Sequence, residues 1–305
     1  MSGWNGRRVV VAGGAGFIGR HLTRALRAAG AEVAVVDNLS TGRDDRLTRL
    51  VNADIAALDR FPISAEVVFN LACPASPRAY QANPVQTWKT SVLGTLRLAE
   101  LASAAEAVIV QTSTSEVYGD PLVHPQTEDY PGNVALTGPR ACYDEGKRAA
   151  EVLLYDMART VGLRVRVARV FNTYGPGMAL GDGRALPAFI EAARACRPLR
   201  LEGGGAQTRS FCHVDDMVRG LMALALCDAA QALPVNLGNP DERPIREAAE
   251  MVVRLLASRS ALVEVAAAEN DPRRRCPDIS RARALLGWEP VVEFEAGLRS
   301  MIDDG

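Results

Sequence analysis

A glycine-rich turn between an apolar strand and an amphipathic helix most constrains the fold of this chain. A β-branched run over residues 8–12 is followed by three glycines spaced G-x-x-G-x-x-G and then by a helical pattern. In a dinucleotide-binding turn the first glycine permits the tight turn, the second lets a pyrophosphate approach, and the third lets the helix pack on the strand. We assign these roles to Gly13, Gly16 and Gly19, with N–H groups at the start of the helix available to phosphates.

The end of the next strand decides whether this turn binds a nucleotide or is a glycine-rich turn without a ligand. The apolar residues 32–36 end in Asp37, about twenty residues past the glycines, which is the spacing of the dinucleotide-binding fold. An acidic side chain there accepts hydrogen bonds from the ribose hydroxyls and repels a 2′-phosphate. Arg43 is a counter-signal, because an arginine accommodates that phosphate. We weigh Asp37 more heavily because it ends the strand, and we expect NAD.

Polar and small residues follow the next predicted strands. A third strand over residues 50–53 ends in Asp54, which either meets the adenine amino group or caps the next turn. The fourth strand ends at Leu71, and a loop of small residues and prolines follows it. Because the carboxyl ends of parallel strands meet at one edge of the sheet, we expect ligands to bind there.

A run of hydroxyl side chains leaves the fifth strand, which we predict over residues 108–111. Residues 112–119 read Thr-Ser-Thr-Ser-Glu-Val-Tyr-Gly. A hydroxyl at a strand end often caps the next helix, but a cap accounts for one of these residues and not for the cluster. The candidate site residues of this segment are Thr112, Thr114, Ser115 and Glu116.

Tyr143 and Lys147 form the candidate catalytic pair. Their i, i+4 spacing puts them on one face of a helix, where an ammonium stabilises a phenolate and lowers the tyrosine pKa toward neutrality. The alternative is an ordinary solvated helix face. Composition favours chemistry, because all but two of the 35 lysine and arginine residues are arginine, and the two lysines are Lys89 and Lys147. A chain with this bias keeps a lysine where a compact, tunable ammonium is needed.

Beyond a sixth strand over residues 163–170 the alternation of strands and helices weakens. We expect a short return strand near residues 235–238 and helices over residues 245–256 and 280–286. The basic run at residues 273–275 is either solvated surface or a site for phosphate or carboxylate.

We therefore predict an α/β protein with a Rossmann-type doubly wound parallel sheet and a smaller, mostly C-terminal substrate-binding domain. The NAD-binding domain is expected over residues 1–172, with a return segment at about 214–238. The substrate-binding domain is expected over residues 173–213 and 239–305.

Composition excludes several classes of partner. The 305 residues carry a net charge of −1, so charge gives no reason to expect binding to nucleic acid or to an anionic membrane. No apolar run approaches the length needed to span a membrane, and no secretory leader is evident. The six cysteines are scattered without a C-x-x-C pair, which favours free thiols in a reducing cytoplasm over disulfides or a metal site.

Short motifs that match a known family are distributed along nearly the whole chain. They are Gly13 to Gly19, Cys73 to Pro77, Asn83-Pro84, Lys89-Thr90, Thr112 to Asp120, Gly138 to Lys147, Arg169 to Pro176, Asp182 to Arg184, Gln207 to Arg209, Asn236 to Pro240, Pro277-Asp278 and Leu286 to Pro290. Together they resemble the extended short-chain dehydrogenase/reductase family and, within it, the UDP-glucuronate decarboxylases, also called UDP-xylose synthases.

The resemblance implies a reaction at two neighbouring carbons of a sugar. Thr114, Tyr143 and Lys147 would form a hydroxyl–tyrosine–lysine triad, in which the tyrosine takes the proton of the 4-hydroxyl while hydride passes to NAD⁺. The 4-keto group lies β to the carboxylate, so it stabilises the enolate left by loss of CO₂ and is then reduced again. Glu116 and Ser115 would lie beside the carboxylate, and Arg275 would engage it or supply a proton.

The resemblance also extends the set of candidate binding residues. The candidate substrate-binding residues are Tyr80, Lys89, Asn172, Arg184, Gln207, Arg209 and Arg275. The candidate cofactor-binding residues are Gly13, Gly16, Phe17, Ile18, Gly19, Asp37, Asn38, Asp54, Ile55, Leu71, Ala72, Thr112, Tyr143 and Lys147. A homodimer through the helices of Lys89 and Tyr143 is implied, although the apolar positions Leu93, Leu96, Val152 and Leu153 can equally face the sheet.

Four positions depart from the family pattern, all of them at places that concern substrate anchoring. Gly177 and Cys276 stand where arginine and lysine are common, His213 replaces a tyrosine, and Ala56-Ala57 replaces a glutamate-containing pair.

Three other functions remain to be weighed. A 4,6-dehydratase places an acid after the threonine, where this chain has Ser115. A 4-epimerase has no use for Glu116 and Arg275. An NAD-binding sensor without turnover is disfavoured because Tyr143 and Lys147 are both present.

Overall fold

A parallel β-sheet forms the centre of the protein in the computed structural model, which describes residues 3–44, 49–181, 183–267 and 273–304. Asp182, part of one motif, lies outside these residues. Within them the sheet has seven strands in the order β11-β6-β5-β4-β1-β2-β3, all paired in parallel. Its strands are β1 (Arg8–Ala12), β2 (Glu32–Asp37), β3 (Leu50–Asn52), β4 (Val67–Asn70), β5 (Val108–Thr114), β6 (Arg164–Val170) and β11 (Pro234–Leu237). This is the predicted doubly wound arrangement.

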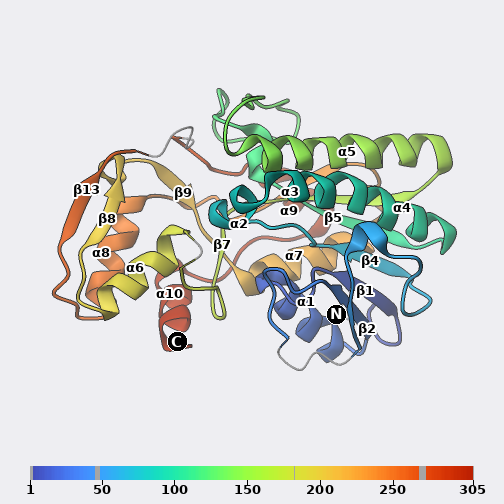
Figure 1. Cartoon of the computed structure of the whole chain (residues 1–305), viewed down its shortest axis with the longest axis horizontal. Helices are drawn as coiled ribbons and strands as arrows, with labels where there is room; N and C mark the ends of the chain where they lie inside the picture. The colour runs from blue at the N-terminus through green and yellow to red at the C-terminus, as the bar shows by residue number, and fades with distance from the viewer. Residues whose placement is uncertain (1–2, 45–48, 182, 268–272, 305) are drawn as a thin grey trace.

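Helices cover both faces of the sheet (Figure 1). The helices on one face are α1 (Phe17–Ala28), α7 (Val214–Leu226) and α9 (Ser280–Leu286), and those on the other are α2 (Pro77–Ala82), α3 (Pro84–Lys89), α4 (Thr95–Ala104) and α5 (Ala141–Val161). A π-helical turn over Thr90–Gly94 joins α3 to α4. Successive side chains of a strand point to opposite faces, so Val9 and Val11 join one hydrophobic core while Val10 and Ala12 join the other. The β-branched strands are buried on both faces for this reason.

A second group of elements lies at one end of the sheet, on the left of Figure 1. It contains α6 (Ala185–Arg194), β8 (Leu199–Glu202), α8 (Ile245–Leu255), β13 (Leu262–Val265) and α10 (Phe294–Asp303), and these elements share a hydrophobic cluster of their own. Three short strand pairs complete it, namely β8 with β13, β7 (Thr173–Tyr174) with β10 (Cys212–His213), and β9 (Thr208–Ser210) with β12 (Glu242–Pro244). The sequence analysis missed α6 and α10, although Phe294, Leu298 and Met301 have helical spacing and are buried.

The order of the strands locates the site. The chain moves from β1 to β2 and β3 on one side and to β4, β5 and β6 on the other, so the direction of winding reverses between β1 and β4. In open parallel sheets of this kind, ligands bind in the crevice outside the carboxyl ends of the strands at that reversal. No helix among the described residues combines the length and the apolar character required to cross a membrane.

Candidate active site

The glycine turn after β1 has no room for side chains at two of its three glycines. Gly13 has a φ of +77°, and a Cβ there would lie 2.6 Å from the main chain of Leu71 and Ala72. A Cβ on Gly19 would lie 2.2 Å from the Gly13 carbonyl oxygen, so the helix packs directly on the turn. Both positions match the roles assigned from the sequence, because main chain approaches main chain at each.

The start of α1 is open to an anion. Gly16 precedes the helix without a side-chain cap, and the first turn, which begins with Phe17 and Ile18, contains no acidic residue. The first N–H groups of a helix lack partners within it and carry the positive end of its dipole. The uncapped N–H groups are available to donate hydrogen bonds to a pyrophosphate, and the adjacent glycine-rich turn leaves room for it.

Asp37 ends β2 beside this turn. Its Oδ2 accepts a hydrogen bond from the Ala15 N–H at 3.0 Å, and its Oδ1 accepts one from the Leu39 N–H at 2.8 Å. Each carboxylate oxygen keeps a second lone pair, which is what a ribose hydroxyl requires. The Oδ1 of the neighbouring Asn38 accepts from the Ser40 N–H at 3.1 Å and so shapes the loop after the strand.

Asp54 makes the cap that the sequence allowed, and its contact with an adenine stays a prediction. Its Oδ1 accepts from the Ala56 N–H at 2.9 Å at the start of a short 3₁₀ helix, Ile55–Ala57. Its Oδ2 accepts from Gln86 Nε2 at 3.2 Å. Ile55 is buried. Both oxygens of Asp54 therefore have protein partners.

The floor of the crevice is built around Asn70, which the sequence analysis did not single out. Its Oδ1 accepts from the Ala72 N–H at 3.2 Å, and its carbonyl accepts from the Thr112 hydroxyl at 2.7 Å. Leu71 donates its N–H to the Ala12 carbonyl at 2.8 Å. Asn70 is 2% exposed at the end of β4. The sequence did offer a signal for Asn70, because an asparagine ends an otherwise apolar strand there.

Thr114, Tyr143 and Lys147 come together as predicted from their motifs. Tyr143 and Lys147 lie in the first two turns of α5 and are buried. The hydroxyl of Thr114, at the end of β5, accepts from the Glu116 N–H at 3.2 Å and is hydrogen-bonded to Tyr143. The Lys147 Nζ lies 5.9 Å from the centre of the Tyr143 ring and donates to the Thr112 carbonyl at 2.8 Å.

The expectation that Lys147 lowers the pKa of Tyr143 toward neutrality is wrong for this structure. Burial raises the pKa of Tyr143 above its usual value, and the hydrogen bond from Thr114 opposes this only in part. Burial likewise lowers the pKa of Lys147. The reason is that removal of the phenolate from water outweighs an ammonium that hydrogen-bonds a carbonyl instead of the tyrosine hydroxyl.

Tyr80 stacks on the candidate base. Its ring lies 5.1 Å from that of Tyr143, with 11° between the planes. The Tyr80 hydroxyl is buried and has no hydrogen-bond partner among the described residues. A buried hydroxyl without a partner is unfavourable unless a ligand supplies one, so Tyr80 is suited to the substrate-binding role expected of it.

Two arginines hold Glu116, which follows Ser115 in a short 3₁₀ helix over Ser115–Tyr118. Arg275 Nη1 lies 2.8 Å from Glu116 Oε1, and its Nη2 donates to Oε2 at 2.9 Å. Arg140 Nη2 donates to the same Oε2 at 2.5 Å. Burial raises the pKa of Glu116, but attraction to Arg275 and Arg140 outweighs burial, so the pKa lies below its usual value.

The basic run is divided in the structure, because Arg275 is buried and paired with Glu116 whereas Arg273 and Arg274 are exposed. Arg275 Nη1 also donates to Asn172 Oδ1 at 3.1 Å, which brings another predicted substrate residue into the site. The sequence analysis missed Arg140, although it lies three residues before Tyr143. Its partner Glu116 is 24 residues away in the chain, and only the fold shows the pairing.

Asp144 adds a second carboxyl group to the site. Burial and the neighbouring Glu116 raise its pKa to about 7, and attraction to Arg140 opposes that shift. Its Oδ2 lies 3.9 Å from Arg140 Nε, and its Oδ1 is buried without a hydrogen-bond partner in the described part of the chain. A carboxyl group of this kind exchanges its proton near neutral pH.

The other predicted substrate residues are dispersed. Arg209 is buried and electrostatically lowers the pKa of Glu116. Arg184 lies with its guanidinium 6.0 Å from the centre of the Phe17 ring, next to the glycine turn. Gln207 accepts the Ile245 N–H through its carbonyl. Lys89 is exposed at the end of α3.

Local geometry accounts for two departures from the family pattern. Gly177 has a φ of +74°, which disfavours arginine or any other side chain, and its N–H donates to Asp304 Oδ2 at 2.7 Å. His213 is buried, accepts from the Asp215 N–H at the start of α7 and hydrogen-bonds Ser300.

Comparisons with known proteins agree with this geometry. UDP-glucuronic acid decarboxylase 6 of Arabidopsis thaliana is 49% identical over 304 residues, covering 97% of this chain and 88% of the relative. UDP-glucuronic acid decarboxylase 1 of Danio rerio is 47% identical, covering 97% and 72%. The structure of MoeE5 in complex with UDP-glucuronic acid and NAD is 30% identical with a TM-score of 0.85, covering 97% of this chain and 98% of MoeE5.

A UDP-glucose 4-epimerase of Thermotoga maritima, solved with UDP-glucose, has a TM-score of 0.90 at 27% identity, covering 97% of this chain and 98% of the epimerase. Residues 9–238 match the family described as "NAD dependent epimerase/dehydratase family". This chain belongs to that family.

Proposed function

We propose that this protein catalyses the NAD-dependent decarboxylation of UDP-glucuronate to UDP-xylose. The observation that carries the proposal is the ionised Glu116 between Arg140 and Arg275, next to the Thr114–Tyr143–Lys147 group. Relatives named UDP-glucuronic acid decarboxylases, 47–49% identical over nearly the whole chain, support it.

NAD would be held by the glycine turn and Asp37 and, when bound, would supply the hydride acceptor and donor for C4 of the sugar. Tyr143 takes up the proton of the C4 hydroxyl. Thr114 orients the Tyr143 oxygen toward that hydroxyl through the hydrogen bond that it makes to the tyrosine. To act as the base, Tyr143 must first lose its own proton. The Lys147 ammonium, 5.9 Å from the centre of the tyrosine ring, is the positive charge that favours the phenolate against the burial that raises the pKa. We also propose that Lys147 contacts the cofactor, together with the glycine turn, Asp37, Thr112 and the loop at Leu71-Ala72.

The arginines act on the carboxylate that leaves. Arg275 presents two N–H groups to Glu116 in a fork that matches a carboxylate. A sugar carboxylate that enters the site competes for this fork. Glu116 beside it repels the carboxylate, whose negative charge passes to the enolate when neutral CO₂ leaves. Because Glu116 has a lowered pKa, it is ionised at neutral pH and does not donate the proton that C5 takes up after CO₂ has left, so that proton comes from water. Arginine keeps its proton in proteins, so we assign Arg275 to binding.

The fold does not separate decarboxylation from the related reactions, since an epimerase has the same architecture. The site favours decarboxylation. A dehydratase needs a proton donor where this chain has the buried Ser115, a poor acid. A 4-epimerase that acts on UDP-glucose has no sugar carboxylate to place beside Glu116 and Arg275.

Incubation with UDP-glucuronate and NAD⁺ tests the proposal. We expect release of CO₂ and a product with the mass of UDP-xylose. Parallel incubations with UDP-glucose test for the 4-epimer and for loss of water. Intact NAD binding with no CO₂ would refute decarboxylation, and turnover of UDP-glucose alone would favour the epimerase or dehydratase. Cofactor binding without turnover of either sugar would favour a sensor.

We further propose that the UDP-sugar lies between the NAD-binding region, residues 1–172 with 214–238, and the region formed by residues 173–213 and 239–305. Two separate hydrophobic cores on the sheet and a third around α6, α8 and α10 support this division. The group around Glu116 draws residues from both regions, since Arg140 comes from the first and Arg275 from the second.

A homodimer and a cytoplasmic location complete the proposal. Trp88, Leu93 and Val152, from α3, the π-helical turn and α5, are 43%, 45% and 60% exposed on neighbouring helices (Figure 1). These side chains do not face the sheet, so they are available to a second copy. Val152→Glu should convert a dimer to a monomer in sedimentation equilibrium, whereas Val291→Glu, at an equally exposed valine elsewhere, should not. The cytoplasmic location rests on the scattered cysteines, and cell fractionation tests it.

A further inference from the structure

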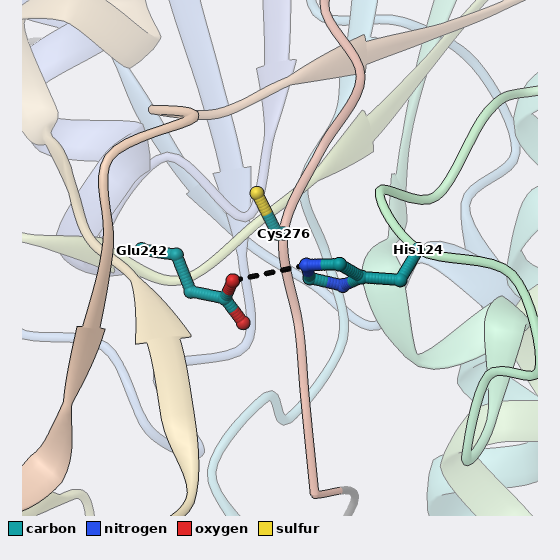
Figure 2. A group of neighbouring side chains, drawn as sticks. All are labelled: His124, Glu242 and Cys276. Carbon is teal, nitrogen blue, oxygen red and sulfur yellow. Dashed lines mark ion pairs between the residues drawn. The ribbon is translucent and has the colours of Figure 1, made fainter.

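Three side chains of types that bind metal ions meet at Cys276, the residue that follows Arg275 in the chain. His124, Glu242 and Cys276 place their ligand atoms within 4.8 Å of one another, and His124 Nε2 lies 3.0 Å from Glu242 Oε2. Figure 2 shows that they come from three separate segments, with Cys276 on the segment between the other two. Neither the redox group nor the carboxylate pocket uses any of them.

Main-chain hydrogen bonds hold two of these segments together. The Gln126 N–H donates to the Cys276 carbonyl at 2.8 Å, and the Cys276 N–H donates to Gln126 Oε1 at 2.8 Å. His124 lies two residues before Gln126 and is fixed relative to the cysteine. The three-segment geometry is thus a property of the backbone rather than of one flexible side chain.

The third segment is β12, where Glu242 pairs with Ser210 of β9. The Thr208 hydroxyl donates to Glu242 Oε1 and leaves Oε2 facing the histidine. Hydrogen bonds of this kind orient the carboxylates that bind metal ions.

A buried hydroxyl without a partner lies beside the thiol. Ser210 is 1% exposed, and its Oγ has no hydrogen-bond partner at normal distance in the described part of the chain. The Ser210 hydroxyl is close enough to the Cys276 sulfur to interact with it, and the thiol itself donates to the Pro240 carbonyl at 3.4 Å. A thiolate would give that hydroxyl a strong acceptor, and a bound cation is what makes a buried cysteine a thiolate.

We propose that His124, Glu242 and Cys276 bind a borderline-soft divalent cation of the Zn²⁺ type, with water as the fourth ligand. Imidazole, carboxylate and thiolate are the ligands that tetrahedral zinc takes, and three of them with one open position form a typical non-structural site. Zinc–ligand bond lengths place tetrahedral ligand atoms roughly 3.3–3.8 Å apart. The histidine–glutamate pair at 3.0 Å therefore has to open slightly, and ligand atoms up to 4.8 Å apart have to approach one another by about 1 Å.

Charge balances in this step. Binding displaces the Cys276 proton to solvent, the imidazole binds in its neutral form, and the thiolate and carboxylate together neutralise the dication. The ligated residue directly follows Arg275, so the cation would anchor the main chain next to the arginine that holds Glu116.

The test measures metal binding directly, on protein that carries no affinity tag, and it does not depend on turnover. Dialysis against Zn²⁺ followed by elemental analysis should give one ion per chain. Titration with Co²⁺ should give a thiolate-to-cobalt charge-transfer band together with the strong visible bands of tetrahedral cobalt. The absence of saturable one-to-one binding, or of the thiolate band, would overturn the proposal.

Three variants locate the site. Cys276→Ser should abolish the charge-transfer band and weaken Zn²⁺ binding at least tenfold. His124→Gln, at a side chain on the surface, should weaken binding at least tenfold while retaining the band, and it decides the question if the cysteine variant does not fold. Cys196→Ser is the matched control, because this thiol is exposed elsewhere and should not matter. Loss of binding in the control, or unchanged binding in both test variants, would overturn the assignment.

Discussion

Replacement of Arg140 by methionine tests whether two arginines hold Glu116 ionised beside the tyrosine. Arg140 and Glu116 are joined across 2.5 Å, and their side chains are only 16% and 13% exposed. Methionine keeps much of the apolar stem of arginine and removes the guanidinium. The change therefore removes the charge and its hydrogen bond with little loss of packing.

The expected magnitude follows from burial and from the contacts that remain. Removal of one partner of a buried ion pair costs about 3–5 kcal/mol, because the other charge is left uncompensated. Glu116 keeps both contacts to Arg275, at 2.8 and 2.9 Å. We therefore expect the lower end of the range, about 3 kcal/mol of unfolding free energy.

Urea unfolding followed by circular dichroism at neutral pH, without ligands, measures this cost. Arg159→Met is the matched control, because Arg159 and its partner Asp156 are 74% and 52% exposed. An exposed pair contributes about 1 kcal/mol at most. If the two variants differ by less than about 1 kcal/mol, the two-arginine account of Glu116 is refuted.

Three further substitutions test the site. Tyr143→Phe keeps the ring that stacks on Tyr80, so NAD affinity should stay within severalfold while turnover falls more than tenfold, or about 1.4 kcal/mol; a smaller fall in steady-state rate would show that Tyr143 is not the base. Glu116→Gln should slow CO₂ release more than oxidation at C4, so the absorbance of reduced cofactor should accumulate, and equal slowing would contradict its role. The pKa of Asp144 is about 7 in the folded protein and about 4 in an unfolded chain, so the native state holds a proton that the unfolded state releases and stability falls as pH rises through this window. Asp144→Asn should therefore gain stability relative to the parent between pH 5 and pH 8, by at most about 4 kcal/mol, in urea midpoints; an unchanged difference would contradict the raised pKa.

The fold was predictable because its signals are local. Successive residues of a β-branched strand pack into the two hydrophobic cores in turn because the strand has a period of two. The turn after β1 needs glycine because backbone approaches backbone at Gly13 and Gly19. The helix pattern of α10 was equally local and was overlooked. For Asp54, sequence alone allowed a cap or a ligand contact, and the position of Gln86 helped to fix the cap.

The features of the candidate site were likewise predictable where they are local in the chain and not where they depend on distant segments. The Tyr143–Lys147 spacing is a property of one helix and could be read directly, but the pKa of Tyr143 depends on burial by segments far away in the chain. The sequence analysis therefore assigned the pair and predicted the wrong direction for its pKa in this structure.

The sequence by itself determined the doubly wound sheet, the nucleotide turn, Asp37 and the helical pair, because backbone sterics and residue periodicity act over a few residues. Only the tertiary structure decided which charges meet. Glu116 and Arg275 are 159 residues apart, and nothing in either segment specifies the other. Arg140, Asp144 and the buried Tyr80 hydroxyl acquire their properties in the same way, because desolvation and Coulombic attraction depend on distances that exist only after the chain has folded back on itself.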